Sequence, residues 1–177
     1  MKDPVQIRIS GAGGQGVITA GVILAEAAML DGLNVVQTQT YGPEARLGSS
    51  KSEVIISRGT IAYPEVTSPD VLLCMSAEAA RKLTAKVGPG TLVILDSSSI
   101  PADVGGPAHA VRLPITETAV RVGGKVVANI VALAVLNSIA PVVSPQSLSA
   151  AIAARVPAKF RELNQRAEEA GRQLAAQ

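Results

Sequence analysis

The amino-acid sequence predicts an α/β fold, a three-layer sandwich with a mainly parallel, partly mixed sheet of the Rossmann-like type. Three observations lead to this prediction. Apolar runs alternate with stretches of helical periodicity up to about residue 113, several of these runs are continuously apolar, and a glycine-rich turn joins the first strand to the first helix. The 177 residues are 47% hydrophobic, so we expect a single domain over 1–177, with a helical segment at about 125–177.

The strand pattern is regular enough to place six strands. The first ends at a turn formed by Gly11 to Gly14, and the second follows Gly32, a suitable helix stop. A polar loop, TYGPEARLGSS, joins the second strand to the third without a helical pattern, so this pair is free to run antiparallel. The expected strands are Val5–Ser10, Leu33–Thr40, Lys51–Ser57, Val71–Met75, Thr91–Asp96 and Ala108–Leu113.

Helices are expected between the strands and throughout the C-terminal part. The first of them has an inward apolar stripe that includes Val17, Ala20 and Leu24. After the sixth strand the pattern predicts helices only, and the last one is strongly charged. The expected helices are Gln15–Leu30, Ala77–Lys86, Lys125–Ile139, Pro145–Ala154 and Ala158–Ala175.

Composition excludes several classes of function. A net charge of +2, with two Tyr, one Phe and no Trp, argues against a nucleic-acid surface. One cysteine, Cys74, and one histidine, His109, are too few for a disulfide, an iron–sulfur cluster or a structural zinc site, so no metal site is expected. The apolar stretch Val126–Val143 is interrupted by polar residues and Pro141, which argues against a membrane span. No signal-peptide pattern opens the chain, and we expect a cytoplasmic protein.

The glycine turn has the spacing Gly11-x-Gly13-x-x-Gly16, half of a dinucleotide-binding fingerprint. Such a turn exposes the amide N–H groups at the start of a helix, which suit phosphate or carboxylate. A carboxylate at the end of the second strand, which holds the ribose in NAD-binding proteins, is absent from NVVQTQT. The spacing therefore leaves three uses open: NAD binding, close packing of helix on strand, and another phosphate-bearing ligand or a partner subunit.

Four blocks of sequence together resemble one known family. The blocks are GAGGQGVITAGVILAEAA, QTQTYGPEARLGSSKSEVIIS, YPEVTSPDVLLCMS and KVVANIVALAVLN, which span about Val5 to Asn137. They are similar to the gamma subunit of 2-oxoacid:ferredoxin oxidoreductases, whose members act on pyruvate, 2-oxoglutarate, branched-chain 2-oxoacids or indolepyruvate. In this family a 2-oxoacid, coenzyme A (CoA) and oxidised ferredoxin become acyl-CoA, carbon dioxide and reduced ferredoxin.

The resemblance implies a subunit without catalytic residues of its own. Thiamine diphosphate, Mg²⁺ and iron–sulfur clusters would be held by alpha and beta subunits, with a ferredoxin-like delta subunit as a further candidate, and ferredoxin would accept the electrons. This chain would help to bind CoA and to close the thiamine-diphosphate site. The two rival hypotheses are an NAD-binding module of a dehydrogenase and a purely structural assembly subunit.

The resemblance also selects candidate binding residues for CoA, whose phosphates want cations and exposed amides. The glycine turn would offer backbone N–H groups, the long loop would offer cations, and a polar side chain interrupts the apolar pattern of a later helix. The candidates are Gly11, Gly13, Gly14, Gln15, Gly16, Tyr41, Arg46, Lys51 and Asn129.

Overall fold

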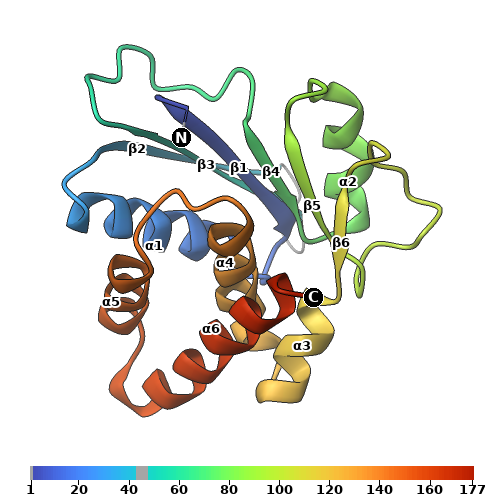
Figure 1. The fold of residues 1–177 in the computed structure, drawn as a ribbon. Helices are drawn as coiled ribbons and strands as arrows, with labels where there is room; N and C mark the ends of the chain where they lie inside the picture. The colour runs from blue at the N-terminus through green and yellow to red at the C-terminus, as the bar shows by residue number, and fades with distance from the viewer. Residues whose placement is uncertain (1, 43–47) are drawn as a thin grey trace.

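A six-stranded mixed sheet forms the centre of the molecule (Figure 1). The computed structural model describes residues 2–42 and 48–177. The strand order is β2-β3-β1-β4-β5-β6, in which β1, β4, β5 and β6 are parallel while β3 runs antiparallel to both β1 and β2. The α/β class with a partly mixed sheet and the antiparallel second and third strands are thus confirmed. The strands are β1 (Val5–Ala12), β2 (Asn34–Tyr41), β3 (Ser49–Ser57), β4 (Val71–Cys74), β5 (Leu92–Asp96) and β6 (Val111–Leu113).

The helices cover the two faces of the sheet unequally. On one face, α1, α3, α4, α5 and α6 enclose the larger apolar core, whereas α2 packs on the other face against β4 and β5 (Figure 1). The sandwich therefore has three layers, as predicted. The helices are α1 (Val17–Leu30), α2 (Ala77–Leu83), α3 (Ile115–Val122), α4 (Ala128–Ile139), α5 (Pro145–Arg155) and α6 (Arg161–Ala175), and the 3₁₀ turns are η1 (Thr84–Lys86), η2 (Lys125–Val127) and η3 (Ala158–Phe160).

Helices follow the sixth strand as expected, but one of them, α3, was not predicted and begins at Ile115, ahead of the segment expected from about residue 125. The start of this helix is held from another element: Asp96, at the end of β5, accepts hydrogen bonds from the Thr116 amide (3.1 Å) and hydroxyl (2.6 Å). Asp96 is fully buried, and its carboxylate suits the positive N-terminal end of α3. A helix of 8 residues is marginal without such tertiary support.

Helix α6 approaches α4 through a residue without a side chain. A Cβ at Gly171 would lie 2.6 Å from both the carbonyl oxygen of Val131 and the Cβ of Ala134. No flexible side chain can move aside here, because the obstructing atoms are backbone and a first side-chain carbon. The close contact brings the charged helix α6 onto the apolar helix α4, where Leu174 is buried.

We expect Gly171→Ala to lower the free energy of unfolding by about 1–2 kcal/mol. Overpacking costs about 1–3 kcal/mol, and the better helix propensity of alanine returns up to about 1 kcal/mol. Urea unfolding followed by circular dichroism measures the difference. Gly88→Ala is the control, because a Cβ at Gly88 meets nothing within 4 Å, and unchanged stability in both variants would contradict the tight contact.

Asp31 connects the end of α1 to the start of α5. Its carboxylate accepts hydrogen bonds from the Ser144 amide (2.6 Å), the Ser144 hydroxyl (2.7 Å) and the Ser147 hydroxyl (2.6 Å). Ser144 in turn caps α5 through the Ser147 amide. Desolvation acts to raise the pKa of Asp31, but the hydrogen bonds from Ser147 and Ser144 outweigh it, so the pKa lies below its ordinary value.

The lowered pKa of Asp31 predicts a pH-dependent contribution to stability. A carboxylate with a depressed native pKa stabilises the fold above its unfolded-state pKa, near 3.8, and this contribution disappears as the pH falls through the native value. Asp31→Asn should therefore cost about 1 kcal/mol at pH 7, allowing for solvent screening, and less near pH 2.5, below the unfolded-state pKa. Urea titrations at both pH values test this, with the exposed-loop variant Asp103→Asn as control; an equal cost at both pH values would contradict it.

Candidate functional site

The candidate site lies where β1 ends and α1 begins. Strand β1 continues through Gly11 and Ala12, which pair with Ser50 and Ser49 of β3, so the turn starts later than the sequence indicated. The amide of Gly13 donates to the carbonyl of Gly48 at 2.8 Å, which ties the turn to the last part of the long loop. Gly14 and Gly16 follow with positive φ angles of 86° and 71°, a conformation that costs little only for glycine.

The glycines of the turn serve two different purposes. Gly11 and Gly16 allow close packing, since a Cβ at Gly11 would lie 2.5 Å from Gln15 Oε1 and one at Gly16 would lie 2.8 Å from Asn129 Nδ2. Gly14 meets nothing within 4 Å and is exposed. Both the packing interpretation and the ligand-binding interpretation therefore apply, each to different residues of one motif.

The side chain of Gln15 fastens the turn to two strands. Its Oε1 accepts from the amide of Ala12 at 2.7 Å, and its Nε2 donates to the carbonyl of Met75 at 2.8 Å. Ala12 ends β1 and Met75 directly follows β4, so the amide group joins the carboxyl ends of two adjacent parallel strands. Gln15 is thus a positioning residue, and its own amide already donates to the carbonyl of Ala12 at 3.2 Å.

The start of α1 retains the features of an anion site. Its N-cap is Gly16, and no side chain caps the helix. The first N–H groups of a helix have no partner within the helix and carry the positive end of its dipole. Since the amides of Gly13 and Gln15 are engaged, the donors that remain for a ligand come from Gly14, Gly16 and the first turn of α1.

Asn129 lies beside the turn, on the side of the sheet that α1 covers. Its Nδ2 is 3.4 Å from the carbonyl oxygen of Gly16, a long hydrogen bond, and only 7% of the residue is exposed. Asn129 is the second residue of α4. The fold therefore brings together Gly14, Gly16 and Asn129, which are far apart in the sequence.

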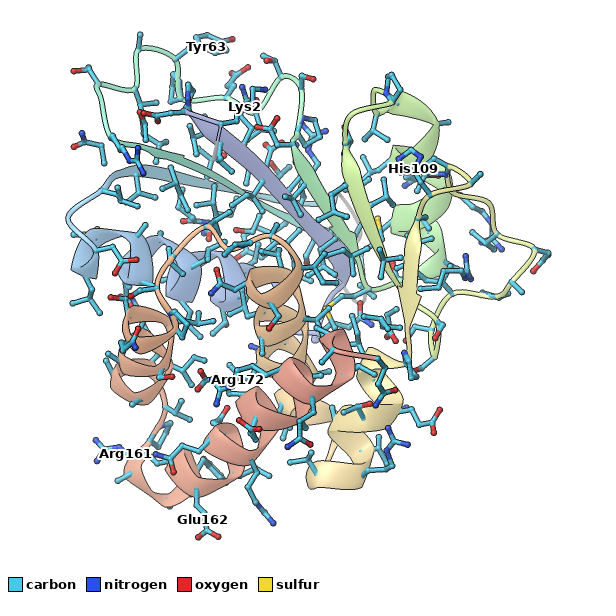
Figure 2. The ribbon with its side chains drawn as sticks, in the orientation of Figure 1. Lys2, Tyr63, His109, Arg161, Glu162 and Arg172 are labelled. Carbon is cyan, nitrogen blue, oxygen red and sulfur yellow. The ribbon has the colours of Figure 1, made fainter. Side chains whose placement is uncertain are left out.

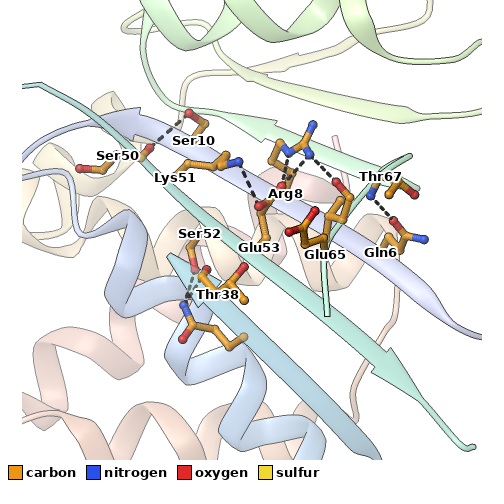
Figure 3. Close-up of polar contacts among 12 residues, drawn as sticks. Gln6, Arg8, Ser10, Thr38, Ser50, Lys51, Ser52, Glu53, Glu65 and Thr67 are labelled. Carbon is orange, nitrogen blue, oxygen red and sulfur yellow. Dashed lines mark hydrogen bonds and ion pairs between the residues drawn. The ribbon is translucent and has the colours of Figure 1, made fainter. Parts of the chain in front are cut away.

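Lys51 lies on the opposite face of the sheet. Its neighbour Ser52 faces α1, where it limits the approach of Gly21, and side chains alternate along a strand. Lys51 Nζ is 3.0 Å from Glu53 Oε2, and Glu53 also accepts from Arg8 at 2.6 Å (Figure 3). Two cations thus share the carboxylate of Glu53 on this face of the sheet.

Of the two remaining loop candidates, the structure describes only Tyr41, which lies near the same edge. Tyr41 ends β2, pairs with Ser50 and is 63% exposed. Arg46 lies outside the described residues. A ligand that contacted both Lys51 and Asn129 would have to pass around the edge of the sheet at the glycine turn, because the two side chains are on different faces.

A cavity of about 360 Å³ opens next to the turn, between the starts of α1 and α4 and the segment from η3 into α6. Its lining includes two residues that sequence reasoning did not select, Phe160 and Asn164. Asn164 is 6% exposed although it lies on a highly charged helix. A polar side chain on the inward face of an amphipathic helix was the available signal.

Other polar residues singled out by the sequence have structural roles. The single cysteine, Cys74, is buried in the core, and burial raises the pKa of its thiol to about 12. His109 lies near the start of β6 (Figure 2), with Nε2 3.2 Å from the carbonyl of Thr91.

Within the described ranges, no group of three or more His, Cys, Asp or Glu residues is arranged to hold a metal ion, and no helix is long and apolar enough to cross a membrane.

The strand order argues against the dinucleotide-binding interpretation. In that arrangement the strand next to the first one runs parallel to it and ends in a carboxylate that binds the ribose. Here the neighbour of β1 is the antiparallel strand β3, which presents its amino end, Ser49 and Ser50, at the glycine turn. The glycine motif therefore lacks the ribose-binding carboxylate of a dinucleotide-binding fingerprint in the structure as well as in the sequence.

Comparisons with known proteins show the family of the chain. The family model described as pyruvate ferredoxin/flavodoxin oxidoreductase matches residues 6–174. The 2-oxoglutarate synthase subunit KorC of Methanothermobacter thermautotrophicus is 44% identical over 177 residues, which covers 96% of this chain and 94% of that protein. The gamma subunit of a keto/oxoacid ferredoxin oxidoreductase from Geobacter sulfurreducens superposes with a TM-score of 0.83 at 44% identity, covering 97% of this chain and 98% of that one.

A larger solved relative contains the same unit. The 2-oxoglutarate:ferredoxin oxidoreductase of Magnetococcus marinus, solved with 2-oxoglutarate, coenzyme A and succinyl-CoA bound, superposes with a TM-score of 0.88 at 25% identity. The match covers 99% of this chain and 32% of that chain. The chain therefore belongs to the pyruvate ferredoxin/flavodoxin oxidoreductase family. Within it, the chain corresponds to the gamma subunit of a 2-oxoacid:ferredoxin oxidoreductase, one part of a multi-subunit enzyme.

The role of Gln15 is testable through the pH dependence of stability. Gln15→Met removes both side-chain hydrogen bonds and should cost about 1–2 kcal/mol at every pH. Gln15→Glu should cost as much at neutral pH, because the ionised carboxylate opposes the Met75 carbonyl, but the protonated form can donate to it. The native state thus favours the proton, and the cost should fall as the pH drops toward about 4.3.

Urea unfolding of the wild type and both variants between pH 3.5 and 7.5 measures this effect. Parallel pH profiles for Gln15→Met and Gln15→Glu would show that the side chain does not bridge Ala12 and Met75.

Proposed function

We propose that this gamma subunit helps to bind CoA and to close the thiamine-diphosphate site of the assembled oxidoreductase. CoA would place its phosphates at the start of α1, with Gly14, Gly16 and Asn129 on one side and Lys51 with the long loop on the other. The observation that carries the proposal is the uncapped α1 N-terminus behind a turn that Gln15 holds fixed. The relative from Magnetococcus marinus, which has CoA bound, supports the choice of ligand.

The remaining candidate residues either extend the proposed CoA site or shape the turn that forms it. Tyr41 and Arg46 would extend the loop side of the site, while Gly11, Gly13 and Gln15 would shape the turn rather than touch the ligand. No residue of this chain is assigned a catalytic role, because the chemistry of the family depends on cofactors. What the chain offers is position, positive charge and exclusion of water around a reaction that takes place on another subunit.

We assign the cofactors to other subunits. A single buried cysteine cannot supply the thiolates that an iron–sulfur cluster needs, so the residues of this chain do not fit such a group. Alpha and beta subunits would hold thiamine diphosphate, Mg²⁺ and the clusters, a ferredoxin-like delta subunit is a further candidate, and ferredoxin would take the electrons. Purified alone, the chain should therefore turn over no 2-oxoacid.

Lys51→Ala should raise the apparent KM for CoA about three- to tenfold in the assembled enzyme. The KM for the 2-oxoacid and kcat should change by less than twofold. The effect is moderate because Glu53 already shares the charge of Lys51 and the lysine is partly exposed to solvent. Steady-state kinetics with each substrate varied in turn measures both constants.

Lys2→Ala provides a matched control. Lys2 is also paired with a carboxylate, that of Asp70 at 2.7 Å, but it lies at the amino end of β1 (Figure 2), away from the glycine turn. Equal KM values for CoA in the Lys51→Ala, Lys2→Ala and wild-type enzymes would remove Lys51 from the site.

A further inference from the structure

Strand β2 forms one edge of the sheet. It pairs with β3 from Asn34 to Tyr41 without a bulge, and no other strand of the described residues pairs with its outer side (Figure 1). The sequence NVVQTQTY contains no proline and no charged residue. Proteins usually protect an exposed edge with a charge, a proline or a bulge. A strand of 8 residues that lacks all three is an open template for another strand.

The pairing with β3 fixes which backbone groups of β2 point outward. The amide of Gly42 donates to the carbonyl of Ser49 at 2.6 Å, and hydrogen-bonded and non-hydrogen-bonded pairs alternate along an antiparallel ladder. The even-numbered residues of β2 therefore bond to β3, and the residues between them direct their N–H and C=O groups away from the sheet. These outward residues are Val35, Gln37, Gln39 and Tyr41.

The helix beside this edge has a partly exposed apolar side. Helical periodicity places Ile18, Val22 and Met29 on one side of α1, and it places Ala20 and Leu24, both fully buried, on the other. Strands β1 and β2 are parallel, since both run antiparallel to β3, and a right-handed crossover between them turns the first side of α1 toward β2. Met29 is 66% exposed, and Ile18 and Val22 are half-buried. An apolar stripe therefore follows the open edge.

Both features fit a second copy of this chain related by a two-fold axis. Residues at such an axis meet their own copies, so a charge there would be repelled, and neither β2 nor the apolar stripe carries one. Only the antiparallel register centred on Thr38 pairs all four outward residues with one another. In that register Val35 lies opposite Tyr41 of the second copy, a favourable pair of a β-branched and an aromatic side chain. Gln37 lies opposite Gln39.

The same register covers two large exposed side chains. Tyr41, 63% exposed, shares a face of β2 with Gln37, whose amide bonds to Ser52 beneath α1. Met29 lies in the last turn of α1, beside the start of β2, and the start of β2 lies opposite Tyr41 of the second copy. The thioether and the ring would thus come together, a favourable kind of contact.

We propose that two copies of this chain pair through β2 in an antiparallel, two-fold arrangement centred on Thr38. The two sheets become continuous, and the apolar sides of the two α1 helices pack against each other. In the assembled oxidoreductase this contact joins two gamma subunits. It does not depend on the proposed role in CoA binding, because it rests on the edge strand and on the side of α1 that faces away from the cavity.

A disulfide at the two-fold axis tests the register in the full-length chain. Thr38 meets its own copy in a non-hydrogen-bonded pair, whose Cα atoms are about 4.5 Å apart, within the range that a disulfide spans. Thr38→Cys should therefore give a disulfide-linked dimer with oxidised glutathione, followed on non-reducing gels. The native Cys74 does not compete, because it is buried and burial raises the pKa of its thiol to about 12.

Thr40→Cys is the matched control. This exposed position on the same face of β2 lies opposite Val36 of the second copy and not opposite itself. Thr40→Cys should be linked about tenfold more slowly than Thr38→Cys, whereas a mixture of Thr40→Cys with Val36→Cys should be linked readily. Equal rates for Thr38→Cys and Thr40→Cys, or no dimer from Thr38→Cys, overturn the proposal.

Sedimentation velocity measures the same contact without a new thiol. The wild-type chain should be a dimer at about 50 µM. Thr38→Lys places two ammonium groups at the axis and should weaken association about tenfold, while Thr40→Lys, whose two copies lie apart, should weaken it by less than about threefold. A monomeric wild type, or a Thr38→Lys variant that associates as tightly as the wild type, contradicts the proposal.

The assembled oxidoreductase distinguishes a second copy of this chain from another subunit as the occupant of the edge. Oxidation of the assembled enzyme that carries Thr38→Cys should link two gamma chains, which the mass of the product identifies. If the introduced thiol stays reduced, or is linked to a different subunit, the edge belongs to another subunit and the proposal is wrong.

Discussion

The geometry of the candidate site depends on one side-chain amide. Gln15 accepts a hydrogen bond from the end of β1 and donates one to the residue after β4, so two parallel strands and the start of α1 are held in one arrangement. The side chain has room only because position 11 is glycine. Glycines at 14 and 16 supply the positive φ angles that bring the chain into α1. A flexible glycine segment thereby becomes a preorganised turn, which lowers the entropy that a ligand must overcome on binding.

The position of β3 decides how the site is divided. Because β3 lies between β1 and β2 and runs antiparallel to both, the side chains near the turn alternate between two surfaces. Lys51 joins Arg8 and Glu53 on one face, while Asn129 and the cavity are on the face covered by helices.

The C-terminal helices complete the site as well as the core. Glu168 of α6 is buried and accepts hydrogen bonds from Ser149 of α5 and from Arg172, which points toward α5 in Figure 2. With the close approach at Gly171, this contact fixes α6 against α4 and α5. Asn164 and Phe160 are held in the cavity wall as a result. For the proposed function, in which this subunit supplies position rather than chemistry, this rigidity matters because a binding surface that moves provides less discrimination.

Much of this fold and part of the site could be predicted from the sequence. Apolar alternation and periodicity are local properties, so the strands and most helices were predicted close to their observed bounds, while the glycine turn begins slightly later than predicted. Helix α3 was not predicted, because its support comes from Asp96 on a distant strand. The sequence also pointed to Asn129, a polar residue in an apolar helix, but not to Asn164, which becomes buried only through packing between helices.

What the sequence by itself determined is the fold class and the family: an α/β sandwich with a glycine turn after its first strand, and four blocks of sequence that resemble the gamma subunit of 2-oxoacid:ferredoxin oxidoreductases. Only the tertiary structure decided which candidates share a surface. Strand order and direction place Lys51 and Asn129 on opposite faces of the sheet, and they bring the ends of β1 and β4 within hydrogen-bonding reach of the Gln15 side chain. The physical reason is that side-chain direction along a strand is local, whereas the neighbour that a strand pairs with depends on contacts across the whole chain.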